Sequence, residues 1–472
     1  MPLLVCEQTE PLSLDAVARS VGCDVVPIVA DREQVLLAIN QAYGEQDVDV
    51  NGVVEDFEQE DPDVLLDQIR GSAGSANDLL DSQGRSPVIK LVNLLLLDAV
   101  KQHASDIHIQ PYEDKLVARI RLDGVLFDAF TLPPTVAEEL ASRVKVMGAM
   151  DIAEKRLPQD GRASIRVGDR AIDLRIASLP TSYGERIVIR LLDKTAKLLS
   201  LDGLGMDPGT LFRFREVVNV EHGLILVTGP TGSGKSTTLY GTLAQVDTTQ
   251  KNALTLEDPI EYHLPGISQT QINTKKGMTF ASGLRSVLRQ DPDIIMLGEI
   301  RDAETATMAI QSALTGHLVF STLHTNDAAG AVTRLLDLGI EPYLVASSVV
   351  AVLAQRLVRR VCPDCAQPIE LTEMDVTRLG VPPEHFVGSA ASRGAGCEAC
   401  RQTGYRGRVG LFELMIIDES VGKLINQHAS SSKIEQQAVR TGMMSLRHDG
   451  LSKVAMGLTT VDEIIRVTAR AV

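Results

Sequence analysis

The stretch GLILVTGPTGSGKSTTL, residues 223–239, decides the fold of this chain. The apolar run 224–228 predicts a buried strand, and residues 236–246 follow with helical spacing. Between them, 229–237 fits the pattern G-x-x-x-x-G-K-[ST] of a phosphate-binding loop. Because the pattern stands between a strand and a helix, we expect this stretch to bind ATP or GTP.

The chemistry of phosphate binding accounts for the residue types in that loop. Glycines let consecutive backbone N–H groups face the phosphate oxygens, and the N-terminus of the following helix adds the positive end of its dipole. Lys235 is expected to reach the β- and γ-phosphates, and Ser236 to bind Mg²⁺. The predicted nucleotide-binding residues of the loop are Gly229, Pro230, Thr231, Gly232, Ser233, Gly234, Lys235, Ser236 and Thr237.

Further apolar runs alternate with helical segments after the loop, which indicates a parallel sheet covered on both faces. The carboxyl ends of parallel strands meet at one edge, so polar residues there are expected near the nucleotide. In DIIMLGEIRD, 293–302, Glu299 follows Gly298 and is the single acid at the strand tip, so we predict that it activates the attacking water. Glu257 in TLEDPIEY and His324 in HLVFSTLHT are further candidates, with a structural polar role as the alternative for each.

Three arginines are candidates for stabilising phosphoryl charge. Arg285 and Arg289, in FASGLRSVLRQDPD, are expected on one helical face, and Arg301 follows Glu299. Hexameric motors often supply such an arginine from outside the site. A surface salt bridge is the alternative for each.

The composition limits the class of protein. A chain of 472 residues, 44% hydrophobic and 23% charged, predicts a globular protein of two to four domains. A net charge of −16, 3% aromatic residues and no Trp argue against nucleic acid binding. The N-terminus lacks the basic region of a signal peptide, and the longest apolar run, 344–354, is shorter than the roughly 20 residues of a membrane span, so neither is expected.

The first 205 residues predict two small α/β regions. The first, 1–46, contains a predicted strand at 25–29 and a predicted helix at 31–44. Residues 47–85 are rich in carboxylates and small residues and predict a flexible linker, with a solvated acidic face as the alternative. Residues 86–205 predict helices at 87–104 and 134–149 and two strand pairs, the first turning at Asp123-Gly124 and the second within 162–180.

Two C-x-x-C pairs stand near the end of the chain, in VCPDC (361–365) and CEAC (397–400). One pair alone is compatible with a redox disulfide, half a metal site or no shared function. Two pairs supply the four thiolates that suit a structural Zn²⁺, and the intervening segment, 366–396, is longer than in short zinc ribbons and predicts a small structure of its own. The predicted ligands are Cys362, Cys365, Cys397 and Cys400, whereas Cys6 and Cys23 are expected to be plain buried thiols.

In combination these motifs resemble the secretion ATPase superfamily, which includes the motors of type II secretion, type IV pili and type IV secretion. The resemblance rests on the phosphate-binding loop, LTLEDPIEY, LRQDPDIIMLGEIRD and TGHLVFSTLHTN, taken in this order. Upstream, HASDIHIQP, RLPQDGR and YGERIVIRLLD are similar to the type II secretion ATPase, the general secretory pathway protein E family. The match runs from Pro87 to the C-terminus.

This resemblance implies an α/β fold, with a RecA-like P-loop ATPase domain after an amino-terminal PAS-like α/β domain. It implies a homohexamer that hydrolyses ATP with Mg²⁺ to drive pseudopilus assembly and protein export, and a structural Zn²⁺. Its implied location is cytoplasmic, peripheral on the inner membrane, on a platform that includes the cytoplasmic domain of the bitopic L component and the polytopic F component. The family's nucleotide-contacting arginines match Arg162 and Arg175.

The implied division of the chain has six parts. Residues 1–46 match only part of the family's longer N-terminal region, which grips a membrane partner. The parts are a partner-binding segment (1–46), an acidic linker (47–85), the amino-terminal α/β domain (86–205), the ATPase domain (206–360), a zinc subdomain (361–405) and a helical C-terminal subdomain (406–472).

Other functions stay open at this point. KRLPQDGR and the modest length favour secretion over a type IV pilus extension motor, and tetracysteine inserts are typical of secretion and extension motors rather than of retraction motors. A nucleic-acid translocating ATPase shares the loop, but the acidic composition argues against it. A nucleotide-binding regulator without turnover is the remaining alternative.

Overall fold

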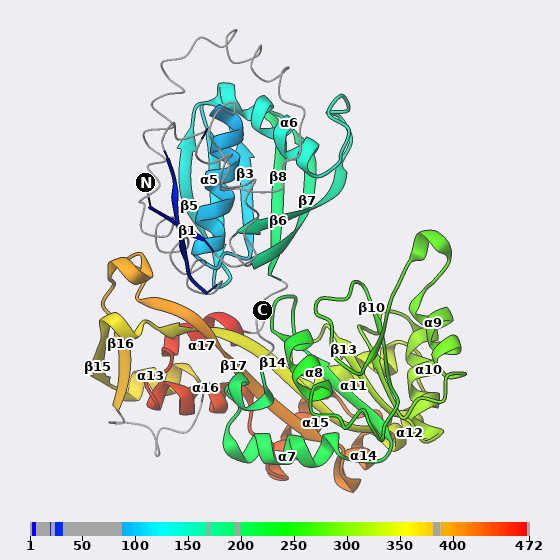
Figure 1. The fold of residues 1–472 in the computed structure, drawn as a ribbon. Helices are drawn as coiled ribbons and strands as arrows, with labels where there is room; N and C mark the ends of the chain where they lie inside the picture. Colours follow the sequence, from blue (N-terminus) through cyan, green and yellow to red (C-terminus); the bar gives the residue numbers. More distant parts are fainter. Residues whose placement is uncertain are drawn as a thin grey trace. The chain divides into compact units, whose positions relative to one another are not determined.

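The computed structural model describes residues 2–5, 19, 24–31, 87–167, 170–193, 199–380, 388 and 390–469. The chain divides into two compact units, Met1–Ala196 and Lys197–Val472 (Figure 1). The predicted strand at 25–29 is β2 (Val26–Val29), which pairs in parallel with β1 (Pro2–Val5). The predicted helix at 31–44, apart from its first residue, and the acidic linker lie outside the described residues, and the finer division into six parts remains a prediction.

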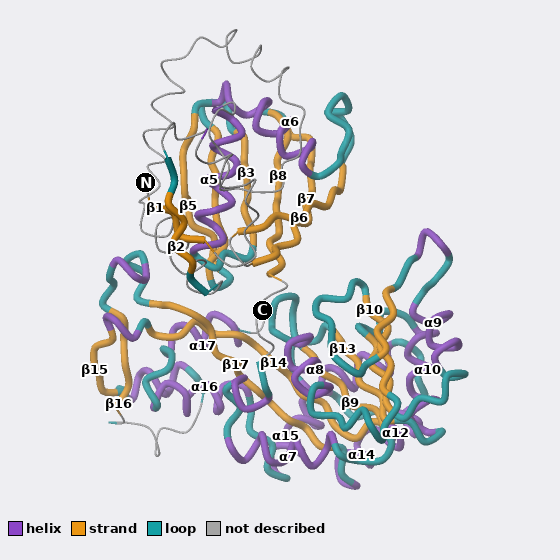
Figure 2. Tube along the Cα trace, in the orientation of Figure 1, coloured by secondary structure: helices purple, strands orange, loops and turns teal. Residues whose placement is uncertain are grey.

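Most of the first unit is a six-stranded antiparallel sheet, in the order β5-β4-β3-β8-β7-β6, with two helices on one face (Figures 1 and 2). The predicted helices and strand pairs are confirmed, and the first pair turns at Asp123 and Gly124, whose φ angles of 48° and 85° suit a tight hairpin turn. The elements are α5 (Pro87–Lys101), β3 (Asp106–Pro111), β4 (Leu116–Leu122), β5 (Val125–Leu132), α6 (Ala137–Met147), β6 (Gln159–Val167), β7 (Arg170–Thr181) and β8 (Gly184–Asp193).

Helices α5 and α6 bury their apolar stripes on this sheet. Leu91 and Leu95 of α5 and Leu140 and Val144 of α6 share one core with the inward residues of the strands, such as Ile107. The alternation of apolar and polar residues along each strand leaves the opposite face polar and rich in arginine.

The second unit is built on a seven-stranded sheet in the order β11-β10-β12-β13-β9-β14-β17. All neighbouring strands run parallel except β17, which is antiparallel to β14. The strands are β9 (Gly223–Thr228), β10 (Ala253–Glu257), β11 (Ser268–Gln271), β12 (Ile294–Leu297), β13 (Leu318–Leu323), β14 (Val349–Val361) and β17 (Tyr405–Ile416). The predicted parallel sheet is therefore confirmed, whereas β11 on one side and β14 and β17 on the other extend it beyond the four strands that the sequence predicted.

Helices cover both faces of this sheet, as predicted. One core gathers residues of six helices, α9 (Phe280–Val287), α10 (Ala303–Leu314), α11 (Ala328–Asp337), α12 (Pro342–Ser348), α14 (Glu419–Asn426) and α15 (Ser431–Arg440). The core on the other face contains α7 (Pro208–Val218) and α8 (Lys235–Leu243). Strand β9 lies between the two cores with all six residues buried, which explains its unbroken apolar sequence.

The far end of β14 leads into a small substructure that carries the cysteines (Figure 1). Its hairpin and helix share a third core with two C-terminal helices, through residues such as Val376, Leu451 and Ile464. These elements are β15 (Ala366–Glu370), α13 (Glu373–Arg378), β16 (Ala390–Gly394), α16 (Leu446–Ala455) and α17 (Val461–Thr468). The predicted small structure between the cysteine pairs is present. The C-terminal part predicted as helical (406–472) is helical only from Glu419 onwards, because its first residues belong to β17.

A buried carboxylate fastens α17 to β14. Arg359 donates to Glu463 from its backbone N at 3.1 Å and from Nη2 at 2.6 Å, and Arg466 Nη2 lies 2.7 Å from the same carboxylate. Burial alone would raise the pKa of Glu463, but the two arginines outweigh it and lower the pKa to about 2. The interaction therefore stabilises the fold fully above about pH 4.5, the ordinary value, and is lost as the pH falls towards 2.

Replacing Glu463 with Gln is expected to lower the free energy of unfolding at pH 7 by about 3 kcal/mol, the equivalent of the pKa shift. The loss should shrink below pH 4, where the native carboxylate begins to take up a proton. Urea unfolding followed by circular dichroism at pH 7 and pH 3 measures both values. The exposed Glu419, which pairs with Lys423, provides the control Glu419→Gln. Equal destabilisation by the two substitutions would contradict this role of Glu463.

Candidate functional site

The phosphate-binding loop connects β9 to α8, as predicted. Gly229 and Gly234 have φ angles of 149° and 88°, and a Cβ atom at Gly229 would lie 2.3 Å from the carbonyl oxygen of Gln355. A side chain at Gly229 is therefore excluded both by the backbone conformation and by β14. Lys235 begins α8, and its Nζ donates to the carbonyl oxygens of Gly229 at 2.8 Å and Pro230 at 3.1 Å.

The electrostatics of the loop fit a phosphate ligand. Burial lowers the pKa of Lys235 to about 8, an effect that the carboxylate of Glu299 opposes and the charge of Arg356 reinforces. The Oγ of Ser233 is buried without a hydrogen-bond partner among the described residues. A bound phosphate would pair with the charge of Lys235, whose Nζ here donates to carbonyl oxygens, and would accept a hydrogen bond from the hydroxyl group of Ser233. Ser236 is exposed at the start of α8, where it is free to take part in Mg²⁺ binding.

Glu299 lies just beyond the tip of β12 with two of the predicted residues around it. Its carboxylate is 2.5 Å from Nη2 of Arg301 and 3.4 Å from Nε2 of His324, and its side chain is only 14% exposed. Thr322 of β13 donates to the carbonyl oxygen of Gly298 at 2.6 Å and so fixes the backbone before the glutamate. The structure thus brings Glu299, Arg301 and His324 together, and the Glu299 charge acts on Lys235.

Glu257 is buried at the end of β10 and turns towards α8. Its carboxylate accepts hydrogen bonds from the hydroxyls of Tyr240 and Thr255 and from Nε2 of Gln269 at 3.0 Å. These contacts join α8, β10 and β11 behind the loop. A catalytic role for Glu257 stays a prediction.

The two arginines of FASGLRSVLRQDPD do not share a helical face. Arg285 is on α9 and pairs with Glu304. Helix α9 ends at Val287, so Arg289 lies beyond it, and the expectation of a common face is wrong. The chain does not return to a helical conformation before Pro292, since Asp291 has a positive φ of 51°.

Arg162 and Arg175 belong to the first unit, on the polar face of its sheet. They are direct cross-strand partners on β6 and β7. The same row continues through Arg190 of β8 to Asp106 of β3, and the Arg190 Nε lies 3.0 Å from the Asp106 carboxylate. A row of arginines with one acid suits an anionic ligand or partner.

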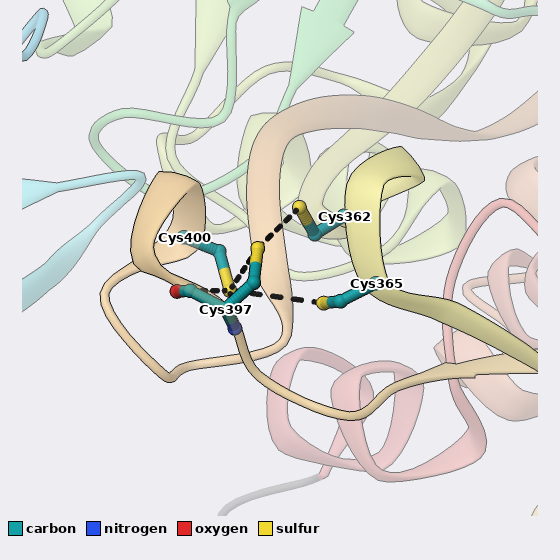
Figure 3. Close-up of side chains that lie close together, drawn as sticks. All are labelled: Cys362, Cys365, Cys397 and Cys400. Atoms are coloured by element: carbon teal, nitrogen blue, oxygen red, sulfur yellow. Dashed lines mark hydrogen bonds between the residues drawn. The ribbon is translucent and has the colours of Figure 1, made fainter.

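The four predicted zinc ligands converge from both ends of the cysteine segment (Figure 3). Their sulfur atoms all lie within 4.8 Å of one another, and the shortest separations, 3.7 to 3.9 Å, join Cys397 to Cys400, Cys365 to Cys400 and Cys362 to Cys397. Four sulfur atoms about 2.3 Å from a tetrahedral Zn²⁺ are about 3.8 Å apart. All four cysteines are free thiols, so this donor set fits zinc rather than a redox disulfide.

Backbone N–H groups also point at these sulfur atoms, as expected around thiolate ligands. Gly396 N lies 3.3 Å from the Cys365 Sγ, and Gly404 N lies 3.2 Å from the Cys400 Sγ. Burial opposes ionisation of Cys400, but donation from the N–H groups of Cys397 and Gly404 lowers its pKa, whereas burial raises the pKa of Cys365. The short turns Pro363–Cys365 and Glu398–Cys400 carry the second cysteine of each pair.

The sequence did not indicate several residues that support the nucleotide site. Thr228 Oγ1 lies 2.7 Å from Thr325 Oγ1 and links β9 to the loop after β13. Gln355 of β14 is buried and accepts from Thr238 Oγ1 of α8 at 2.6 Å, while the adjacent Arg356 contacts the loop after β13. The run of apolar and β-branched residues in 349–361 was the available signal for β14, but only the order of the strands shows what it touches.

Comparison with known proteins shows which family the chain belongs to. The family model described as "Type II/IV secretion system protein" matches residues 81–466. The chain belongs to this family. The type II secretion system protein E of Aeromonas hydrophila is 49% identical over 471 residues, which cover 99% of this chain and 92% of that protein. The type II secretion system ATPase E of Vibrio cholerae is 47% identical over 430 residues, 91% of this chain and 84% of that protein.

Two proteins named for type IV pili or pilus retraction are also similar to the chain. The type IV pilus assembly ATPase PilB of Myxococcus xanthus is 42% identical over 467 residues, 98% of this chain and 82% of that protein. Among solved structures, the pilus retraction motor PilT with bound ADP has a TM-score of 0.53 and 25% identity, covering 80% of this chain and 96% of that one. The predicted superfamily, the α/β ATPase fold and ATPase activity are therefore confirmed. Among the described residues, no helix combines the length and apolar character needed to cross a membrane.

Proposed function

We propose that this secretion ATPase works as a homohexamer that drives pseudopilus assembly and protein export by a type II secretion system. The observation that carries the proposal is the 49% identity, over 99% of the chain, to a protein named for that system. The described cysteine cluster is consistent with this assignment, since tetracysteine inserts are typical of secretion and extension motors. The similarity to the pilus assembly ATPase is lower, at 42%, so pilus extension is not favoured.

At the site, Lys235 binds the β- and γ-phosphates of ATP, and the backbone N–H groups of residues 231–237 surround them. Ser236 holds the Mg²⁺ that neutralises phosphate charge. Glu299 takes a proton from the water that attacks the γ-phosphate, and ADP and inorganic phosphate leave. Its contact with His324 orients the carboxylate.

The arginines supply the charge that the transferred phosphoryl group needs. Arg301 contacts Glu299. Arg285 is on α9, and Arg289 follows the end of that helix. In the hexamer, Arg162 and Arg175 reach the nucleotide from the arginine-rich face of the first unit. Because Arg162 and Arg175 pair with the nucleotide in the hexamer, the rate of ATP turnover depends on assembly of the hexamer.

The cysteine cluster binds one Zn²⁺ through Cys362, Cys365, Cys397 and Cys400, which fixes the fold of the segment. The motor is peripheral on the cytoplasmic face of the inner membrane. There it binds the platform proteins of the secretion system, the cytoplasmic domain of the bitopic L component and the polytopic F component. No nucleic acid partner is expected from a chain with a net charge of −16.

The test is a chromosomal Lys235→Ala substitution in the host bacterium. Secreted enzymes should accumulate in the periplasm as they do after deletion of the gene, while surface pili stay at the wild-type level. The exposed Lys251, substituted as Lys251→Ala, is the matched control and should secrete normally. Loss of pili with normal secretion would contradict the proposal.

A further inference from the structure

The strand β14 passes the nucleotide site on the side away from β12 and β13. The order β13-β9-β14 puts β9 in the middle, and Leu323, Thr228 and Ala354 are level with one another at its tip. Strands two apart in a sheet are separated by about 9–10 Å. A side chain that joins β14 to the loop after β13 must therefore cross the tip of β9, where the phosphate-binding loop starts.

Arg356 makes this crossing. It follows two residues after Ala354, and its Nη2 donates to Oδ1 of Asn326 at 2.8 Å and to the carbonyl oxygen of Asn326 at 3.4 Å. Asn326 comes two residues after His324, whose Nε2 lies 3.4 Å from the Glu299 carboxylate. The arginine therefore holds the same loop that presents His324 to the proposed catalytic glutamate.

The loop after β13 is fixed from β9 as well. Thr228 Oγ1 contacts Thr325 Oγ1 at 2.7 Å and accepts from Thr325 N at 2.9 Å. Asp327 ends the loop and caps α11 by accepting from Gly330 N at 2.7 Å. The backbone of residues 325–327 is thus held at three points, of which only Arg356 reaches across from β14.

Packing alone does not explain an arginine at this position. Within the part of the chain that the structure describes, the Nε of Arg356 is buried without a hydrogen-bond partner, and no carboxylate forms an ion pair with the guanidinium. Burial lowers the pKa of Arg356, and the more distant charge of Asp327 opposes that effect. Burying part of a guanidinium without an ion pair costs free energy, and an uncharged side chain of similar length would avoid that cost.

We propose that Arg356 is a positioning residue of the ATPase site, which holds residues 324–327, and with them His324, in place across the tip of β9. The proposal rests on the nucleotide site proposed above. It gives β14 a role in catalysis, because the strand carries both this arginine and Gln355, which supports α8 through Thr238.

The first test is Arg356→Met, which keeps the length of the side chain and removes its charge and donors. The kcat for ATP hydrolysis should fall about 10- to 100-fold, because small displacements of groups around a reacting centre have effects of this size. The Kd for a fluorescent ADP analogue should change by less than about threefold, since Lys235 and the loop backbone remain. A purely structural role would instead lower ADP binding and kcat together.

A double-mutant cycle with Asn326→Ala tests whether the two residues act through one contact. Asn326→Ala should reproduce most of the loss in kcat, and the double substitution should be little worse than either single one. Arg360→Met is the matched control, because Arg360 is on the same strand but exposed, and it should keep wild-type kcat.

The outcomes separate this inference from the site assignment. A folded Arg356→Met protein with kcat within twofold of wild type, a parallel loss of ADP binding, or additive effects in the cycle would each overturn the inference while the site assignment stands. In the same binding assay Lys235→Ala should lose the ADP analogue. If it binds normally, the nucleotide site is wrong and this inference falls with it.

Discussion

Replacing Glu299 with Gln is expected to reduce the kcat for ATP hydrolysis by about 10²- to 10⁴-fold, the range that a general base contributes. The amide keeps the size of the side chain and accepts from Arg301, but it has far too low a basicity to take a proton from water. Binding of ADP and ATP should persist, because the phosphate contacts come from Lys235 and the loop. Phosphate release under saturating ATP and equilibrium nucleotide binding measure the two effects separately.

The control is Glu419→Gln, since the side chain of Glu419 is 85% exposed and pairs with Lys423 at the surface. It should hydrolyse ATP at the wild-type rate. More than about a tenth of wild-type activity in Glu299→Gln would mean that another group activates the water. Glu257 would then be the next candidate, although its carboxylate already accepts three hydrogen bonds behind the loop.

Replacing Cys362 with Ser is expected to remove zinc from the protein and to destabilise the cysteine segment strongly. Structural zinc sites contribute about 10–16 kcal/mol of apparent binding free energy in isolated peptides, and a site with three thiolates loses much of it. The sheet core and the helices around β9 should stay folded, because their two cores do not include the cysteine segment. Zinc per chain, measured by elemental analysis, should fall from about one to near zero.

Proteolysis provides the second measurement for this substitution. Cleavage within 366–396 should become fast in Cys362→Ser and stay slow in Cys6→Ser, because Cys6, which lies outside the described residues, is not one of the four predicted zinc ligands. A Cys362→Ser protein that is free of zinc, equally resistant to protease and fully active would contradict a structural metal site. Wild-type protein that contains no zinc after growth with zinc present would also contradict a structural metal site.

The parts of the site that follow one another along the chain could be predicted from the sequence. The residue types at 229–237 and the spacing of the two cysteine pairs reflect local geometry, since a loop cradles phosphate and a C-x-x-C turn presents two thiolates. Glu299 was recognisable for a similar reason, because a strand and its tip are consecutive in sequence.

The supporting residues could not be predicted because their neighbours depend on the order of strands. Arg356 meets Asn326 only because β9 lies between β13 and β14, and the sequence does not encode that order in any local pattern. The apolar run 344–354 also spans the end of α12 and the start of β14, so its periodicity changes within the run. Arg289 was predicted on the helix because the spacing of 280–289 does not mark the end of α9 at Val287.

The central claim is that this chain hydrolyses ATP at the loop 229–237 with Glu299 as the base. The most direct test is the rate of phosphate release by the purified chain with Mg²⁺ and ATP, for the wild type and for Lys235→Ala and Glu299→Gln. The expected result is turnover by the wild type, loss of nucleotide binding and turnover in Lys235→Ala, and loss of turnover with binding kept in Glu299→Gln. Equal turnover by all three proteins would contradict the account.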